Sequence, residues 1–146
     1  MRAIAGSLVM ACLGGLGATA SPVLAQQAIH ETEQADFRVV TVAGGLEHPW
    51  SMAFLPGGDM LVSEREGRLR YIEDGVLRDA PVAGIPDVFS VEQGGLLGIE
   101  LHPEFETNRL VYLAFAEGQS SSNRTALARG RLSEDGTALE GVEMLF

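Results

Sequence analysis

The chain carries a glycine turn followed by a strand-length apolar run at residues 92–103, EQGGLLGIELHP. Gly94 and Gly95 permit backbone angles that a side chain forbids. The run from Leu96 to Leu101 is almost continuously apolar, which predicts a strand buried on both faces. Pro103 cannot donate to a sheet ladder, so we expect the strand to end before it.

Gln93 is the candidate binding residue of this stretch. Its neutral amide supplies both donors and an acceptor, and the two glycines that follow it let other groups approach closely. Two interpretations follow from these residues alone. The side chain is either aimed into a pocket or belongs to an ordinary surface turn.

The same order of short strands and turns occurs twice along the chain. The strand-ending prolines Pro56 and Pro103 recur at the period of about 40 to 50 residues that propeller blades have. We therefore predict an all-β fold, a β-propeller of which about the first two blades are present. The strands that carry this prediction are expected at residues 51–55, 60–64 and 68–72, and again at 96–101, 108–116 and 125–132.

Segments between and beside these strands are assigned from composition. Residues 37–42 are rich in β-branched side chains and predict a further strand. Two prolines in residues 81–88 indicate an extended connection. Residues 117–124 are interpreted as a polar insertion, and residues 141–146 as the start of another strand. No helix of convincing length is predicted after the first segment.

The N-terminus has the layout of a secretory signal peptide. A basic residue, Arg2, precedes an uncharged apolar run, and small residues end it at Val23-Leu24-Ala25. We predict a signal peptide over residues 1–25, cleaved after Ala25, and hence a periplasmic or secreted protein without a retained membrane span. A retained anchor and a lipoprotein site at Cys12 are the alternatives. Residues 26–36 are predicted to be a disordered leader before the domain at 37–146.

Charge and composition exclude several classes of function. The chain has 20 acidic against 10 basic residues and a net charge of -10, which argues against a nucleic-acid partner. The basic residues are all arginine, so a catalytic lysine is excluded. The single cysteine lies in the expected signal peptide, which excludes disulfides and thiolate zinc sites in the mature chain.

The remaining titratable and aromatic residues give no complete active site. His48 and His102 each precede a proline and are interpreted as structural turn histidines. Glu64 and Glu66 are interpreted as solvated charges, because nothing near them separates their pKa values. Trp50 is expected to pack in a blade core or to cap one. No catalytic residue and no metal ligand is assigned in this chain.

The chain resembles the glucose/sorbosone dehydrogenase family, and within it the soluble aldose sugar dehydrogenases that depend on pyrroloquinoline quinone (PQQ). Matching segments follow one another in the family's order over almost the whole expected domain. They are residues 46–58, 60–65, 67–70, 84–88, 93–97, 101–103, 108–113 and 125–132. The resemblance departs at Gly98, where close bacterial members often carry an aspartate.

The resemblance implies a six-bladed propeller that holds PQQ at the top of its central channel, with calcium beside it. It implies oxidation of an aldose at the anomeric hydroxyl to a lactone, with a histidine as the base and an electron acceptor as a further partner. Gln93 is the one pocket residue that carries over, as a group lining the sugar and quinone pocket. The catalytic histidine, the calcium ligands and the arginines that hold PQQ are expected beyond Phe146.

The resemblance therefore predicts a truncated N-terminal portion of such a dehydrogenase, inactive by itself. A secreted propeller module that binds a partner without catalysis is the alternative. A propeller hydrolase, in which calcium activates water and no quinone binds, is a weaker third interpretation.

Overall fold

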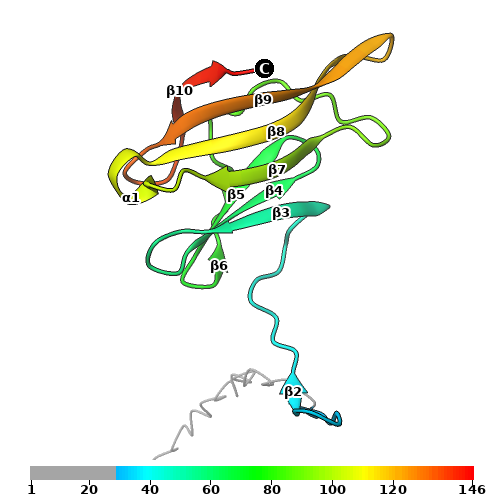
Figure 1. Cartoon of the computed structure of the whole chain (residues 1–146), viewed down its shortest axis with the longest axis vertical. Coiled ribbons are helices and arrows are strands. Elements are labelled where there is room, and N and C mark those ends of the chain that lie inside the picture. Colours follow the sequence, from blue (N-terminus) through cyan, green and yellow to red (C-terminus); the bar gives the residue numbers. More distant parts are fainter. Residues whose placement is uncertain (1–28) are drawn as a thin grey trace, which may run out of the picture. The chain divides into compact units, whose positions relative to one another are not determined.

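The computed structural model describes residues 29–146 and divides into two units, Met1–Val40 and Thr41–Phe146 (Figure 1). In the described part of the first unit, β1 (Ile29–His30) pairs antiparallel with β2 (Phe37–Arg38). The expected signal peptide lies outside the described residues, and so does the beginning of the expected leader. Among residues 29–146, no helix combines the length and apolarity that crossing a membrane requires.

The strand predicted at residues 37–42 is right only for its first two residues. β2 ends at Arg38, and the valines that follow it, Val39, Val40 and Val42, are exposed. β-branched residues favour strands because they pack well on a half-buried pleated surface. Without that burial, their composition alone does not produce a strand here.

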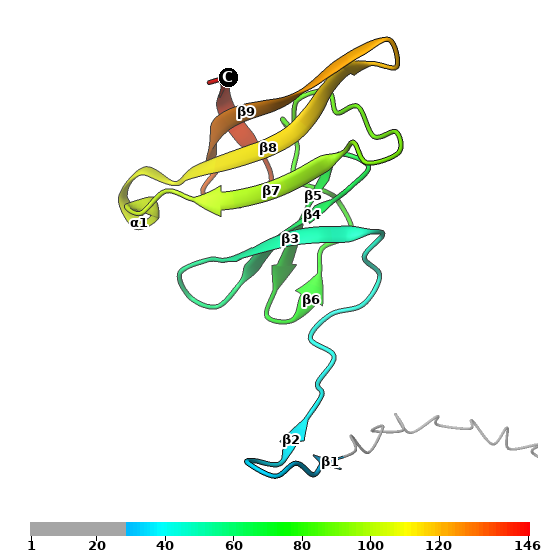
Figure 2. The same cartoon turned by 45° about the vertical axis from the view of Figure 1, so that its right-hand side comes forward.

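The second unit consists of two four-stranded antiparallel sheets in which each strand pairs with the next one along the chain (Figures 1 and 2). Both sheets are thus meanders of the size of a propeller blade, which confirms the predicted all-β propeller architecture. The first contains β3 (Pro49–Phe54), β4 (Met60–Glu64), β5 (Arg68–Glu73) and β6 (Val76–Leu77); the second contains β7 (Leu96–Leu101), β8 (Leu110–Gln119), β9 (Ser122–Leu132) and β10 (Leu139–Met144).

β7 has the bounds predicted from its apolar run, but one part of that prediction is wrong. Leu96 and Ile99 are buried, whereas Glu100 is exposed, so the strand is not buried on both faces. One face of β7 packs against β3 and β4 of the first sheet. After Leu101 the chain leaves the sheet before Pro103 and forms the single-turn helix α1 (Phe105–Asn108).

The predicted polar insertion at residues 117–124 is also wrong. β8 and β9 pair without interruption up to Gln119 and Ser122, so these residues form the end of a long hairpin (Figure 1). Polar side chains are compatible with a strand when both of its faces are open to solvent, because the ladder hydrogen bonds do not depend on side-chain polarity. The hydrophobic alternation that marks a strand in sequence is absent there for the same reason.

The main core lies between the two sheets. Large side chains from both sheets are fully buried in it, including Leu61, Leu69, Leu113 and Phe115. Ser63 joins the sheets inside this core: its hydroxyl donates to the carbonyl of Leu97 at 2.7 Å. A smaller cluster of Met60, Val62 and Ile72 lies on the opposite face of the first sheet.

Candidate functional site

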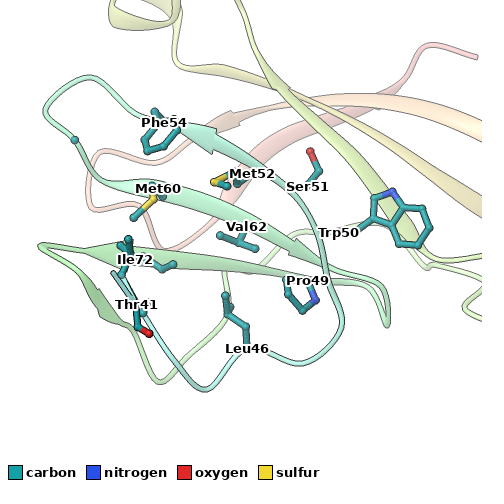
Figure 3. Close-up of a pocket in the computed structure, with 13 residues that line it drawn as sticks. Thr41, Leu46, Pro49, Trp50, Ser51, Met52, Phe54, Met60, Val62 and Ile72 are labelled. Carbon is teal, nitrogen blue, oxygen red and sulfur yellow. The ribbon is translucent and has the colours of Figure 1, made fainter. Parts of the chain in front are cut away.

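The larger hollow of the second unit is an apolar groove of about 730 Å³ on that opposite face of the first sheet (Figure 3). Its lining side chains are nearly all aliphatic, aromatic or thioether groups, and Figure 3 shows Met52, Met60 and Val62 close together on the face. Such a surface offers packing and almost no polar group for orienting a reactant. We therefore do not assign chemistry to it.

Trp50 lies at this groove and corrects the sequence prediction. It was expected in or capping a blade core, but 56% of it is exposed, as are 60% of Met52 and 67% of Phe54. Alternation along β3 sends Met52 and Phe54 to one face, while Ser51 and Ala53 point to the face that packs against β7. Trp50 lies at the register shift between Pro49 and Ser51 and lines the same groove. Among the described residues, the β3 part of this apolar face is exposed, whereas Met60, Val62 and Ile72 on the neighbouring strands are buried.

Gln93 lies in a second, more polar hollow of about 280 Å³, which we call the Gln93 recess. The loop before β7 forms one wall of it, and the tip of the β8–β9 hairpin forms the other. Both segments lie at the same end of the second sheet, because Leu96 at the start of β7 pairs with Phe115 of β8. The residues that line the recess are Phe89, Val91, Glu92, Gln93, Gly94, Ser120 and Asn123.

The loop that carries Gln93 is held in place by Arg65, from the turn between β4 and β5. The Arg65 guanidinium donates to the carbonyl of Glu92 at 3.0 Å, and the Arg65 carbonyl accepts from the backbone N–H of Leu96 at 2.9 Å. Glu92 has a left-handed φ of 53°, which is uncommon for a residue other than glycine. Such a conformation persists only where surrounding contacts fix it, and these two hydrogen bonds bracket Gln93.

Gly95 is required by the same arrangement. A Cβ added there would lie 2.5 Å from the carbonyl oxygen of Arg65, and the residue has a φ of +153°. The glycine therefore lets the loop pass directly over the Arg65 backbone. This close approach fixes the position from which the Gln93 side chain, which is exposed, reaches the recess.

Glu64 is the most deeply buried charged group of the described residues, with no exposed surface. Its carboxylate accepts from Arg68 Nε at 2.6 Å, from the backbone N–H of Glu47 at 2.6 Å and from Arg70 Nη1 at 3.4 Å. The prediction that Glu64 is a solvated charge is therefore wrong. Burial raises the pKa of Glu64, but the Glu47 N–H and the charge of Arg68 outweigh it and lower that pKa below its ordinary value.

Acid is expected to remove a stabilising contribution of Glu64. The pKa of Glu64 is lower in the folded than in the unfolded state. The stabilisation by Glu64 is therefore fully present above pH 4.5, the ordinary pKa, and is lost as the pH falls through the lowered pKa. Urea unfolding at several pH values from about 6 to about 3 should show a smaller acid loss for Glu64→Gln than for the unmodified chain. Parallel pH curves for the two proteins would contradict this assignment.

The histidines have local partners at strand boundaries. His48 Nδ1 lies 2.6 Å from a carboxylate oxygen of Glu66, and His102 Nδ1 accepts from the backbone N–H of Glu104 at 3.0 Å. His102 also contacts the side-chain amide of Asn108 at 2.8 Å. These contacts fit the expected structural role of both histidines, and neither ring lines the Gln93 recess.

The described residues do not by themselves fit PQQ or calcium. Within residues 29–146, no group of three or more His, Cys, Asp or Glu side chains is arranged to hold a metal ion. PQQ carries several carboxylates, which are bound by concentrated positive charge. The lining of the Gln93 recess contains the carboxylate of Glu92 and neither arginine nor lysine. What this chain offers at the recess is a set of hydrogen-bonding groups for a neutral, hydroxyl-rich molecule.

Sequence reasoning singled out Gln93 as a candidate and did not single out the other polar residues that line the recess, namely Glu92, Ser120 and Asn123. The turn-forming serines and the preceding glycine at residues 118–122 were the only signal that a hairpin ends there. The sequence contains no periodicity that places this hairpin tip opposite Gln93.

Comparison with known proteins gives a consistent set of relatives. The family model described as Glucose / Sorbosone dehydrogenase matches residues 46–146. The aldose sugar dehydrogenase YliI of Escherichia coli (strain K12) is 41% identical over 103 residues, which cover 69% of this chain and 28% of YliI. The chain spans about 30% of the length of the curated relatives it matches.

The solved structures that are similar in both sequence and fold include two aldose sugar dehydrogenases. The apo-form of the soluble aldose sugar dehydrogenase from Escherichia coli is 40% identical, with a TM-score of 0.66 over 69% of this chain and 30% of that one. The PQQ-bound form of the aldose sugar dehydrogenase from Streptomyces coelicolor is 36% identical, with a TM-score of 0.62 over 74% of this chain and 32% of that one.

Proposed function

The chain belongs to the glucose/sorbosone dehydrogenase family, and on that premise we propose that it forms the first two blades of a PQQ-dependent aldose sugar dehydrogenase. The proposed reaction is oxidation of the anomeric hydroxyl of an aldose to a lactone, with the electrons passed on to an external acceptor. The proposed location is the periplasm or the extracellular space, reached by the signal peptide at residues 1–25. Calcium is proposed as a second cofactor.

One observation carries this proposal. The matched region contains the loop with Gln93, and in the structure this side chain lines a polar recess at the end of the second sheet. A relative with a solved structure is a PQQ-bound aldose sugar dehydrogenase, and it is 36% identical to this chain.

The contribution of Gln93 to the reaction is to bind and orient the sugar. The Gln93 amide can donate to one hydroxyl oxygen and accept from another hydroxyl, and therefore restrict how the ring lies. PQQ would supply the two-electron oxidation when bound, held by groups other than the described ones. The proton-accepting base and the calcium ligands are likewise proposed to lie outside residues 29–146.

The test is an assay of the complete gene product that contains this chain, purified without cofactor and then supplied with PQQ and calcium. We expect aldose-dependent reduction of a redox dye that requires added PQQ, with a lactone as the product. Gln93→Ala should raise KM for the aldose, because it removes a hydrogen-bonding group from the sugar site. A PQQ-loaded protein that binds aldoses but reduces no dye would overturn the dehydrogenase proposal and favour the non-catalytic binding module.

A further inference from the structure

The wall of the recess that faces Gln93 is formed by the tip of the β8–β9 hairpin. Ser120 and Asn123 from this tip line the recess together with Glu92 and Gln93. The residues that line this hollow of about 280 Å³ thus include one that carries a carboxylate, two that carry side-chain amides and one that carries a hydroxyl.

The hairpin tip has a defined conformation. Ladder pairing continues to Gln119 and Ser122, so only a two-residue turn connects the strands. Gly118 has a φ of +114°, and its Cα lies so close to the opposite strand that an added Cβ would come within 2.4 Å of the Ser122 carbonyl oxygen. Arg124 and Glu117 close the hairpin further with an ion pair of 2.6 Å. A binding group on this tip is therefore largely preorganised.

The loop that forms the facing wall, residues 89–94, is also held by hydrogen bonds. The N–H of Phe89 donates to the carbonyl of Ala116 on β8 at 2.8 Å, which attaches the loop to the hairpin's own strand. The N–H of Gly94 donates to the carbonyl of Val91 at 2.9 Å and closes the turn. The Phe89 contact fixes the loop relative to the second sheet, and the Arg65 contact to Glu92 fixes it relative to the first sheet.

The chemistry of the lining selects a class of ligand. Amide and hydroxyl groups donate and accept hydrogen bonds, and so do the neighbouring hydroxyls of a sugar. Phe89 and Val91 supply the apolar surface that the C–H face of a sugar ring requires. The Glu92 carboxylate disfavours anions, and no basic side chain lines the recess to compensate for it.

We propose that Ser120 and Asn123 bind hydroxyl groups of a neutral sugar, so that the β8–β9 hairpin tip determines sugar specificity together with Gln93. The inference rests on the proposed function, since it names the part of the substrate site that this chain supplies. It adds two contact residues that recognise the sugar at hydroxyls other than the one being oxidised.

Sugar binding to the complete gene product, measured without PQQ, tests this proposal apart from catalysis. D-glucose is titrated and detected by saturation-transfer NMR on the unmodified protein and on the Asn123→Ala and Ser120→Ala variants. Each variant loses one neutral hydrogen bond, so we expect Kd to rise roughly threefold to tenfold. Ser121→Ala is the matched control, because Ser121 occupies the same turn and does not line the recess.

Glucose 6-phosphate provides the charge test, and it should bind more weakly than glucose because of Glu92. Unchanged glucose affinity in both variants, or tighter binding of the phosphate, overturns the inference.

With PQQ loaded, Asn123→Ala should raise KM for the aldose and leave kcat close to that of the unmodified enzyme. If glucose binding depends on Asn123 but the PQQ-loaded protein reduces no dye, the dehydrogenase proposal is refuted and the role of the hairpin stands. If the protein reduces the dye and the variants have an unchanged KM for the aldose, the role of the hairpin is refuted and the dehydrogenase proposal stands.

Discussion

Glu64→Ala is expected to lower the free energy of unfolding by about 3–5 kcal/mol, the range for removing one partner of a buried ion pair. The substitution leaves Arg70, whose side chain is 11% exposed, without its carboxylate partner, and Arg68 loses its Glu64 contact and retains Glu47 at 2.6 Å. It also removes the acceptor of the Glu47 N–H, which ties the loop before β3 to the sheet. The loss therefore combines uncompensated positive charge with a loosened entry into the first sheet. Urea unfolding followed by far-UV circular dichroism measures it.

Glu73→Ala is the matched control for this experiment. Glu73 also pairs with an arginine, Arg78, at 3.0 Å, but its side chain is 53% exposed. Pairs of this kind contribute little in water, so the change should stay below about 1 kcal/mol. Equal effects of the two substitutions would show that burial of Glu64 does not determine its contribution.

Gly95→Ala is the second substitution with a large expected effect, a loss of about 2–4 kcal/mol from overpacking and backbone strain together. The new Cβ would collide with the Arg65 backbone, which has no alternative rotamer to relieve the contact. The loop can accommodate the methyl group only by moving away from Arg65. That movement would displace the neighbouring Gln93, so binding of the sugar should weaken together with stability.

Gly44→Ala provides the comparison for Gly95→Ala. An added Cβ at Gly44 meets no atom within 4 Å, so its stability should change by no more than about 0.5 kcal/mol. Urea unfolding measures stability, and the NMR resonances of the Gln93 side-chain amide report the position of the loop. Gly95→Ala with an unmoved Gln93 resonance and unchanged stability would contradict the structural role assigned to the glycine.

Local sequence patterns predicted the strands of the two sheets well, because each signal is contained within a few neighbouring residues. β4 and β7 have the predicted bounds, since alternation or an apolar run ends at a turn residue in each case. Glu64 shows the limit of this reasoning. Its burial depends on two arginines contributed by the neighbouring strand and on a backbone N–H from a preceding loop, which no local pattern reveals.

The candidate site shows the same limit. Gln93 was predicted from a family resemblance, whereas Ser120 and Asn123 were placed in a polar insertion without a role. Their position opposite Gln93 results from the continued pairing of β8 with β9, and those strand ends carry no hydrophobic alternation. Sequence analysis could identify one wall of the recess, and the structure was needed for the other.

The exposed side chains of β3 on the apolar face of the first sheet also give the protein a spectroscopic reporter. Trp50 is the single tryptophan of the chain, and it lies on this face with more than half of its surface in contact with water. Indole emission shifts to shorter wavelength when the ring leaves water for an apolar environment. The fluorescence spectrum of the protein therefore reports the solvation of one defined surface without any added label. Under the proposed two-blade assignment, a shift of this emission to shorter wavelength in a longer gene product would show that additional residues cover the face.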